Sequence, residues 1–247
     1  ALQAGEVDII CSIPTTQANY LSSTDGVTVV GQPSTRVAWM QFNTINGDSP
    51  VNDLKVRQAL NYAIDRDSLI AGVLDGYAVK VASISTPEYN DYDASVQGYT
   101  YDPEKAKSLL AEAGYADGFT VDLSVSPGML NATDVAQAVA SQLAEVGVTV
   151  NIQQEDSATQ RDKIMSGTVA PIFLNSLGGP YCDIELIASI GFTKGGRYCT
   201  WDSDEFGDLA SRAAAAVDDT ERARLHSEMQ QFMVDQAPAV WLYQQDT

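Results

Sequence analysis

A short polar segment at residues 175–183 has the side chains best suited to bind a small molecule. Glycine lets a ligand approach the backbone closely, and the neutral polar side chains beside it can donate and accept hydrogen bonds. The same letters also describe a plain Gly-Pro turn between a strand and a helix, with Asp183 capping that helix. The residues alone leave both interpretations open. The candidate ligand contacts are Asn175, Ser176, Leu177, Gly178, Gly179 and Tyr181.

Arg197 is a second candidate, because a guanidinium can bind a carboxylate or phosphate through two parallel hydrogen bonds. The alternative is a surface arginine that pairs with local acids on an acidic protein. Trp39 and Tyr243 could stack on a ligand, but an aromatic residue in an alternating strand is often part of the core. The 126–131 loop adds Ser126 and Met129 as candidate ligand contacts, and Met129 could form an apolar wall or lie at an exposed loop tip.

Three cysteines, Cys11, Cys182 and Cys199, contain no C-x-x-C pair and therefore no zinc ribbon or thioredoxin-like motif. In an oxidising compartment Cys182 and Cys199 could form a disulfide worth about 3 kcal/mol by loop entropy. Two free buried thiols are the alternative. Cys11 would then be the odd cysteine.

The inventory of residues argues against an enzyme. The single histidine, His226, lies among charged residues of an expected helix, which favours a solvated, structural position over a catalytic one. No nucleophile elbow, P-loop or dinucleotide-binding glycine pattern occurs. We expect no catalytic residues, no metal site and no cofactor.

The composition is that of a folded, acidic protein. Lys and Arg number 14 against 33 Asp and Glu, which gives a formal net charge of −19, and 45% of the 247 residues are hydrophobic. Such a charge repels phosphate backbones, so we expect no nucleic-acid partner.

Helical spacing of apolar residues and capping residues predicts six helices. The first is capped by Asp53 and the second by Asp102, with proline at its first position. The other four are expected near residues 133–145, 158–166, 204–216 and 219–236.

Runs rich in Val, Ile, Phe and Tyr predict six strands that alternate with these helices. They cover residues 27–30, 37–42, 119–125, 148–152, 171–175 and 239–243. The stretch 119–175 is expected to be strand, helix, strand, helix, strand, which indicates an α/β layer structure with parallel strands. Residues 83–101 have no clear period and are interpreted as an ordered surface loop.

Two long stretches resemble the extracellular solute-binding proteins, family 5, of ABC importers. The first is residues 52–77, Asn-Asp-Leu-Lys-Val-Arg-Gln-Ala-Leu-Asn-Tyr-Ala-Ile-Asp-Arg and onward; the second is residues 101–115, Tyr-Asp-Pro-Glu-Lys-Ala-Lys-Ser-Leu-Leu-Ala-Glu-Ala-Gly-Tyr. The opening at residues 2–9 and the end at residues 235–243 also resemble that family, in the same order.

The resemblance implies a periplasmic-binding-protein-like α/β lobe of type II, or cluster C, with a mixed sheet flanked by helices. Residues 1–35 would pack on a missing first lobe, and residues 36–247 would form the second lobe, with a returning hinge strand near 239–247. The implied partners are a small or peptide-like solute, the permease subunits of an ABC transporter and the first lobe. The implied location is periplasmic or extracellular, with or without a lipid anchor.

The resemblance also implies a contrast with peptide binders. These resemble one another in a Trp-x-x-Asp whose aspartate holds the peptide ammonium, and Leu177 and Pro180 stand at those positions. Dipeptide binders also place an arginine after the strand at 119–125, where this chain has Ser126-Pro-Gly-Met129-Leu-Asn131. Because burial of an ammonium without a carboxylate costs several kcal/mol, free dipeptides are expected to be poor ligands.

Two other functions remain as alternatives. One is a stand-alone sensor or regulatory domain that kept the lobe and lost transport. The other, more remote, is a hydrolase that uses the Ser176 region, which would need a base within hydrogen-bond reach.

Overall fold

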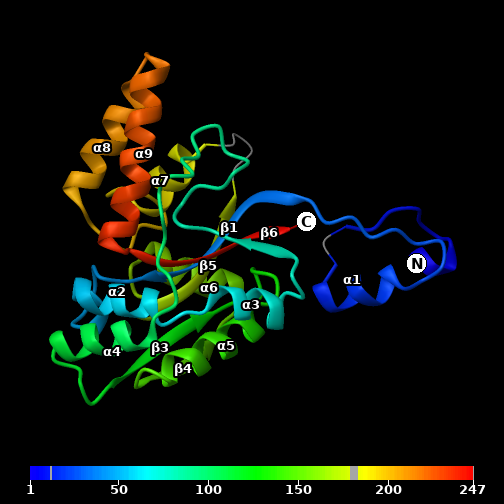
Figure 1. Cartoon of the computed structure of the whole chain (residues 1–247), viewed down its shortest axis with the longest axis horizontal. Helices are drawn as coiled ribbons and strands as arrows, with labels where there is room; N and C mark the ends of the chain where they lie inside the picture. The colour runs from blue at the N-terminus through cyan, green and yellow to red at the C-terminus, as the bar shows by residue number, and fades with distance from the viewer. Residues whose placement is uncertain (12, 179–182, 247) are drawn as a thin grey trace.

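A six-stranded mixed sheet forms the centre of the molecule (Figure 1), and its strand order is β2-β6-β1-β5-β3-β4. The computed structural model describes residues 1–11, 13–178 and 183–246. The strands are β1 (Pro33–Phe42), β2 (Ala78–Lys80), β3 (Phe119–Val125), β4 (Val148–Gln154), β5 (Ile172–Gly178) and β6 (Ala239–Asp246). β3 is parallel to β4 and β5, whereas β1 is antiparallel to β5 and β6. The predicted α/β class and the parallel arrangement of the 119–175 region are confirmed.

Two apolar cores lie on opposite faces of the sheet. One face is covered by α2 (Leu54–Tyr62), α3 (Arg66–Val73), α4 (Pro103–Glu112) and α5 (Ala132–Ala144). The other is covered by α7 (Glu185–Gly191), α8 (Asp204–Ala215) and α9 (Asp219–Gln236). A smaller cluster includes α6 (Ser157–Met165) through Ile164. Alternation along β1 divides its side chains between the faces, with Met40 in the first core and Trp39 in the second.

The predicted caps are present where the sequence placed them. Asp53 Oδ1 accepts from the backbone N–H of Lys55 at 2.7 Å, and Asp102 Oδ1 accepts from Lys105 at 2.8 Å. The first predicted helix is α2, and a separate helix that was not predicted, α3, follows it because Asp65 caps a new helix through the N–H of Ser68 at 3.0 Å.

One expectation about the elements is wrong, one is incomplete, and some elements were not predicted. Residues 27–30 form no strand, since they lie in an extended arm that no described strand flanks. Residues 83–101 form a loop at the surface, as expected, but residues 83–86 are buried, and Ile84 and Tyr89 pack into the second core. The sequence analysis did not predict α1 (Thr15–Ser22), α3 or the short strand β2, whereas α7 follows Asp183 as the turn interpretation expected.

Residues 1–11 and 13–32 form an arm that extends away from the sheet (Figure 1, dark blue) and contains η1 (Leu2–Ala4) and α1. Among the described residues, two side-chain hydrogen bonds join α1 to elements beyond the arm. Asn131 Nδ2 donates to Thr15 Oγ1 at 3.2 Å, and the Tyr77 hydroxyl donates to Asn19 Oδ1 at 3.3 Å. The chain therefore enters the sheet from the arm at the start of β1.

Candidate functional site

One end of the sheet brings several strand ends together, and we call it the strand-end face. It comprises the carboxyl ends of β3, β4 and β5, the start of β1 and the end of β6. The start of β1 lies beside the end of β5, where Arg36 pairs with Gly178, and beside the end of β6, where Pro33 pairs with Asp246. In open α/β sheets, ligands bind outside the carboxyl ends of parallel strands. The candidate residues Ser126, Ser176 and Gly178 all lie at this face.

Arg36 lies across the end of β5, and the sequence analysis did not select it. Its Nη1 donates to the carbonyl oxygen of Ser176 at 3.2 Å and to Ser176 Oγ at 3.3 Å. A Cβ on Gly178 would lie 2.9 Å from the Arg36 Cα, so glycine is required here by the close approach of β1. Gly178 therefore serves strand pairing, and its contact with a ligand stays a prediction.

A buried chain of hydrogen bonds fixes the end of β3. Ser126 Oγ donates to Gln160 Oε1 at 2.6 Å, and Gln160 Nε2 donates to Ser124 Oγ at 3.1 Å. Ser124 Oγ in turn donates to Glu155, which is paired with Lys163. The Ser126 hydroxyl is thus held from α6 and is nearly buried at the start of the 126–131 loop, and its contact with a ligand stays a prediction.

Asn175 and Leu177 are half-buried on β5. Asn175 Nδ2 donates to Gln41 Oε1 at 3.4 Å, and Leu177 packs against the second core. Met129 is 6% exposed and belongs to the first core. This position differs from both expectations for Met129, an apolar wall of the ligand site and an exposed loop tip.

Trp39 and Tyr243 lie inside the protein. Trp39 is 1% exposed, packs against Phe192 and Trp241, and donates its indole N–H to Gln41 Oε1 at 3.0 Å. The Tyr243 side chain has no exposed surface, and burial raises the pKa of its hydroxyl. No ring face is left for a ligand, so the structure corrects the stacking role and favours the core alternative for both residues.

Arg197 is separated from the strand-end face. Its neighbour Tyr198 accepts from Gln41 Nε2 at 3.0 Å, and Gln41 lies five residues along β1 from Arg36, a span of about 17 Å. The Arg197 side chain is exposed and forms no ion pair with the residues that the structure describes. The structure therefore does not bring Arg197 together with Ser126 and Ser176.

The predicted contacts Gly179 and Tyr181, together with Pro180 and Cys182, lie outside the described residues. Cys199 has a free thiol whose Sγ lies 2.8 Å from the carbonyl oxygen of Trp201, and burial raises its pKa. The structure thus gives no support to the bridge between Cys182 and Cys199. Cys11 is exposed and also free.

His226 is buried, contrary to the expectation of a solvated position. Its Nδ1 lies 3.2 Å from Asp91 Oδ2, and its Nε2 lies 3.1 Å from Glu185 Oε1. Asp91 Oδ2 also accepts from the N–H of Ile184 at 2.9 Å, which joins the 83–101 segment to the start of α7. His226 therefore has a structural role, since neither ring nitrogen contacts Ser176.

The buried carboxyl group of Asp91, which contacts His226 and the N–H of Ile184, predicts that the stability of the chain depends on pH. Burial is the main cause that raises the pKa of Asp91, so the folded chain keeps a proton that the unfolded chain releases above about pH 4. The free energy of unfolding should consequently fall as pH rises from about 4 through the raised value. Urea unfolding between pH 4 and pH 7 should show a steeper loss in the wild type than in Asp91→Asn.

Asp93 provides a matched control on the same segment. Hydrogen bonds from Ser227 and Ser95 lower its pKa, so its stabilising contribution is lost only as pH falls below about 4. Asp93→Asn should follow the wild-type slope between pH 4 and pH 7. Equal slopes for the wild type and Asp91→Asn would contradict the assignment.

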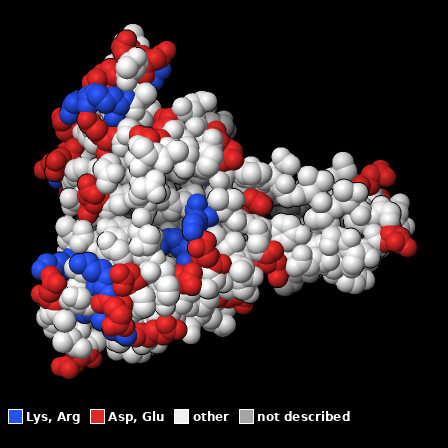
Figure 2. Space-filling view, viewed as in Figure 1, with Lys and Arg blue, Asp and Glu red and all other residues white. Residues whose placement is uncertain are grey.

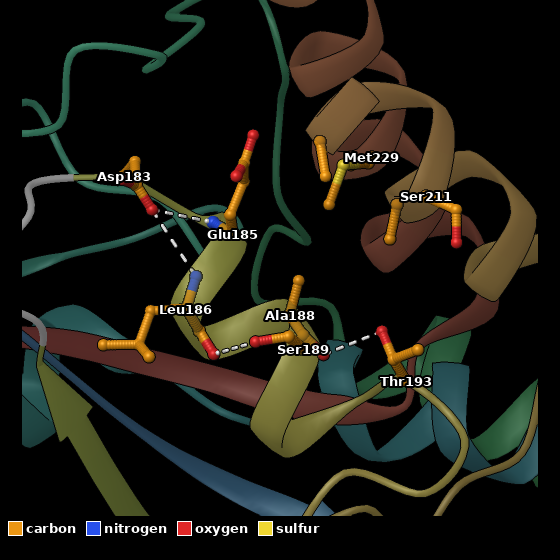
Figure 3. A pocket seen from close by; sticks show the side chains of 10 residues that line it. Asp183, Glu185, Leu186, Ala188, Ser189, Thr193, Ser211 and Met229 are labelled. Carbon is orange, nitrogen blue, oxygen red and sulfur yellow. Dashed lines mark hydrogen bonds between the residues drawn. The ribbon is translucent and has the colours of Figure 1, made fainter. Parts of the chain in front are cut away.

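A hollow of about 400 Å³ lies between α7, α8 and α9 (Figure 3). Met229 and Ser211 face it from α9 and α8, and Asp183 accepts from the N–H groups of Glu185 and Leu186 at its rim. Asp183 thus takes the predicted capping role. The hollow contains none of the strand-end residues, so it is separate from the candidate site.

A second hollow of about 520 Å³, with Tyr62, Tyr99 and Asp235 in its wall, lies between α2, α4 and α9 and is likewise separate from the strand-end face. Among the described residues, no cluster of three or more His, Cys, Asp and Glu could hold a metal ion. Within the same residues, no helix combines the length and apolar character needed to cross a membrane.

The chain is similar to known proteins along nearly its whole length. Residues 1–196 match the family described as bacterial extracellular solute-binding proteins, family 5 middle. The dipeptide-binding protein of Escherichia coli K12 is 32% identical over 222 residues, covering 87% of this chain and 41% of that protein. Heme-binding protein A of Haemophilus influenzae is 32% identical over 244 residues, covering 96% of this chain and 44% of that protein.

Solved structures share the fold. A periplasmic binding protein DppA from Helicobacter pylori, in complex with the peptide STSA, has a TM-score of 0.89 at 24% identity. The PBP AgaA of A. tumefaciens R10, in complex with agropinic acid, has a TM-score of 0.84 at 26% identity. Both alignments cover 100% of this chain and about half of the other, 49% and 51%. The chain spans less than half the length of the two curated relatives above.

Proposed function

Because the chain belongs to the bacterial extracellular solute-binding proteins of family 5, we propose that it is one of two lobes that close on a small organic solute. The complete protein would deliver that solute to the permease subunits of an ABC importer. The observation that carries the proposal is the strand-end face, which gathers the Ser126 loop, Ser176 and Arg36 at the end where the chain enters and leaves the sheet. We propose a periplasmic or extracellular location and no covalent chemistry.

The composition of the arm supports a first lobe as its partner. Residues 1–32 contain only three charged side chains, Glu6, Asp8 and Asp25, and Figure 2 shows the arm as mostly uncharged. Exposed apolar side chains that gather on one segment of low charge are typical of a surface that another protein surface covers. We propose that residues 1–35 pack on that lobe. The exposed apolar side chains of the arm are Val7, Ile9, Ile10, Tyr20 and Val30.

Closure of two lobes would give the site its affinity. A ligand stabilises the closed form only as far as it binds that form better than the open one, so both lobes must contact the solute. The bonds from Asn131 and Tyr77 to α1 show how the arm can contact this lobe beside the 126–131 loop. The strand-end face would then form one wall of the enclosed site.

The proposal is tested by native mass spectrometry of the complete protein purified from its source. A solute of defined mass that is retained under native conditions and released by denaturation would support it. Turnover of an added substrate by this chain would contradict it, because neither nitrogen of His226 is placed to activate a nucleophile at the strand-end face.

We expect free dipeptides to bind poorly to the complete protein. No carboxylate stands at Leu177 or Pro180, and the 126–131 loop has no arginine. A dipeptide ammonium would be buried there without an anionic partner, at a cost of several kcal/mol. Calorimetric titration with a mixture of dipeptides should give dissociation constants well above micromolar, and submicromolar binding would refute the expectation.

A further inference from the structure

We propose that Arg36 binds an oxyanion of the solute, a carboxylate or a phosphate, and so sets the substrate class as an organic acid. This inference rests on the proposed solute-binding function. Arg36 is exposed at the start of β1, where the chain passes from the arm into the sheet. Two structural features support the assignment: the orientation of its guanidinium and the absence of a described carboxylate partner.

The guanidinium is held in place by one of its nitrogens. Nη1 donates to both the carbonyl oxygen and the Oγ of Ser176, which holds the guanidinium over the end of β5. Nη2 and Nε donate to no described residue. They form the edge of the fork that binds a planar oxyanion through two parallel bonds. Arg36 is thus oriented by the protein, while its remaining donors are free of described partners.

Most of the other basic side chains differ from Arg36, because they pair with a carboxylate or are buried. With 33 acidic residues available, eight of the 14 basic residues have a carboxylate within 4.0 Å: Lys55, Lys80, Lys107, Lys163, Lys194, Arg212, Arg222 and Arg224. Arg57 and Arg66 are buried and donate to carbonyl oxygens.

Four basic residues remain without an ion pair to the described residues, and three of them lie elsewhere. Lys105 is on α4, Arg161 is on α6, and Arg197 lies beyond the other end of β1. The nearby Glu88 accepts from Gln244 and forms no ion pair with Arg36. An arginine left unpaired at the strand-end face of a protein with a net charge of −19 is suited to an anionic ligand.

The test uses the complete protein in four forms: wild type, Arg36→Gln, Arg36→Lys and Arg161→Gln. Native mass spectrometry gives the occupancy and composition of the retained solute after incubation of each form with an extract of the growth medium. Arg161→Gln is the matched control, because it removes another exposed and unpaired arginine. The thermal midpoint of each form is measured after the solute has been stripped.

The expected solute carries a carboxylate or phosphate, and Arg36→Gln should reduce binding about tenfold or more. Arg36→Lys should lose less, since it keeps the charge without the planar fork. Arg161→Gln should match the wild type, and all stripped forms should melt within about 3 °C of one another.

Two results would overturn the inference and leave the proposed function standing. One is a retained solute without an acid group. The other is a behaviour of Arg36→Gln that shows no binding role: either wild-type occupancy, or a loss of occupancy together with a lower melting midpoint, the mark of a structural link between β1 and β5. A wild-type protein that retains no solute from the extract would contradict the proposed function itself, and this inference with it.

Discussion

Replacement of Arg66 with methionine should lower the free energy of unfolding by about 3–5 kcal/mol, because the change leaves several buried acceptors unpaired. Arg66 Nε donates to the carbonyl oxygen of Trp241 at 2.6 Å. Its Nη1 donates to the carbonyl oxygens of Asn61 and Ile64, both at 3.2 Å, and Nη2 donates to Asn61 Oδ1 at 3.1 Å. One side chain thus ties the end of α2 and the start of α3 to β6.

Burial lowers the pKa of Arg66 to about 10, so the guanidinium stays charged at neutral pH and its bonds are charge-assisted. Methionine restores the apolar volume but none of the donors. Urea unfolding of the chain measures the difference, and Arg161→Met, the same replacement at an exposed arginine, should change stability by no more than about 0.5 kcal/mol. Equal midpoints for the two variants would show that the Arg66 bonds add no net stability.

The complete protein should bind its solute about a thousandfold or more tightly than this 247-residue chain alone, a difference of about 4 kcal/mol. The chain offers a single wall at the strand-end face, so a bound solute would remain open to water on its other side. Closure adds contacts from a second lobe and excludes water, which strengthens every polar contact to the solute.

Calorimetric titration of both proteins with the same purified solute measures this difference. A heat-denatured sample of the complete protein serves as the control for nonspecific binding. Comparable dissociation constants for the chain and the complete protein would mean that the site is complete within these residues, contrary to the two-lobe account.

Local signals in the sequence were sufficient for most of the secondary structure. The caps at Asp53 and Asp102 act on N–H groups two or three residues away, so their effect can be derived from spacing alone. The parallel strands of residues 119–175 follow from alternation with helices. Residues 27–30 were misread because β-branched residues favour a strand only where a neighbouring strand is available.

The candidate site was harder to predict, because its contacts join residues that are distant in the sequence. Arg36 is 140 residues from Ser176, and no local pattern distinguishes it from a surface arginine. His226 looked solvated from its charged neighbours, yet its partners Asp91 and Glu185 come from elements 135 and 41 residues away. The core was one of the two positions expected for Trp39, and the structure places it there. This alternative could be derived from the sequence because alternation along a strand is a local signal.

Hydrogen exchange of the complete protein, measured with and without its solute, tests most directly whether the strand-end face of this chain binds the ligand. Added protection should concentrate in residues 33–37, 124–131 and 173–178, with little change on α8 and α9. Protection confined to the hollow between α7, α8 and α9, or none within this chain, would contradict the account.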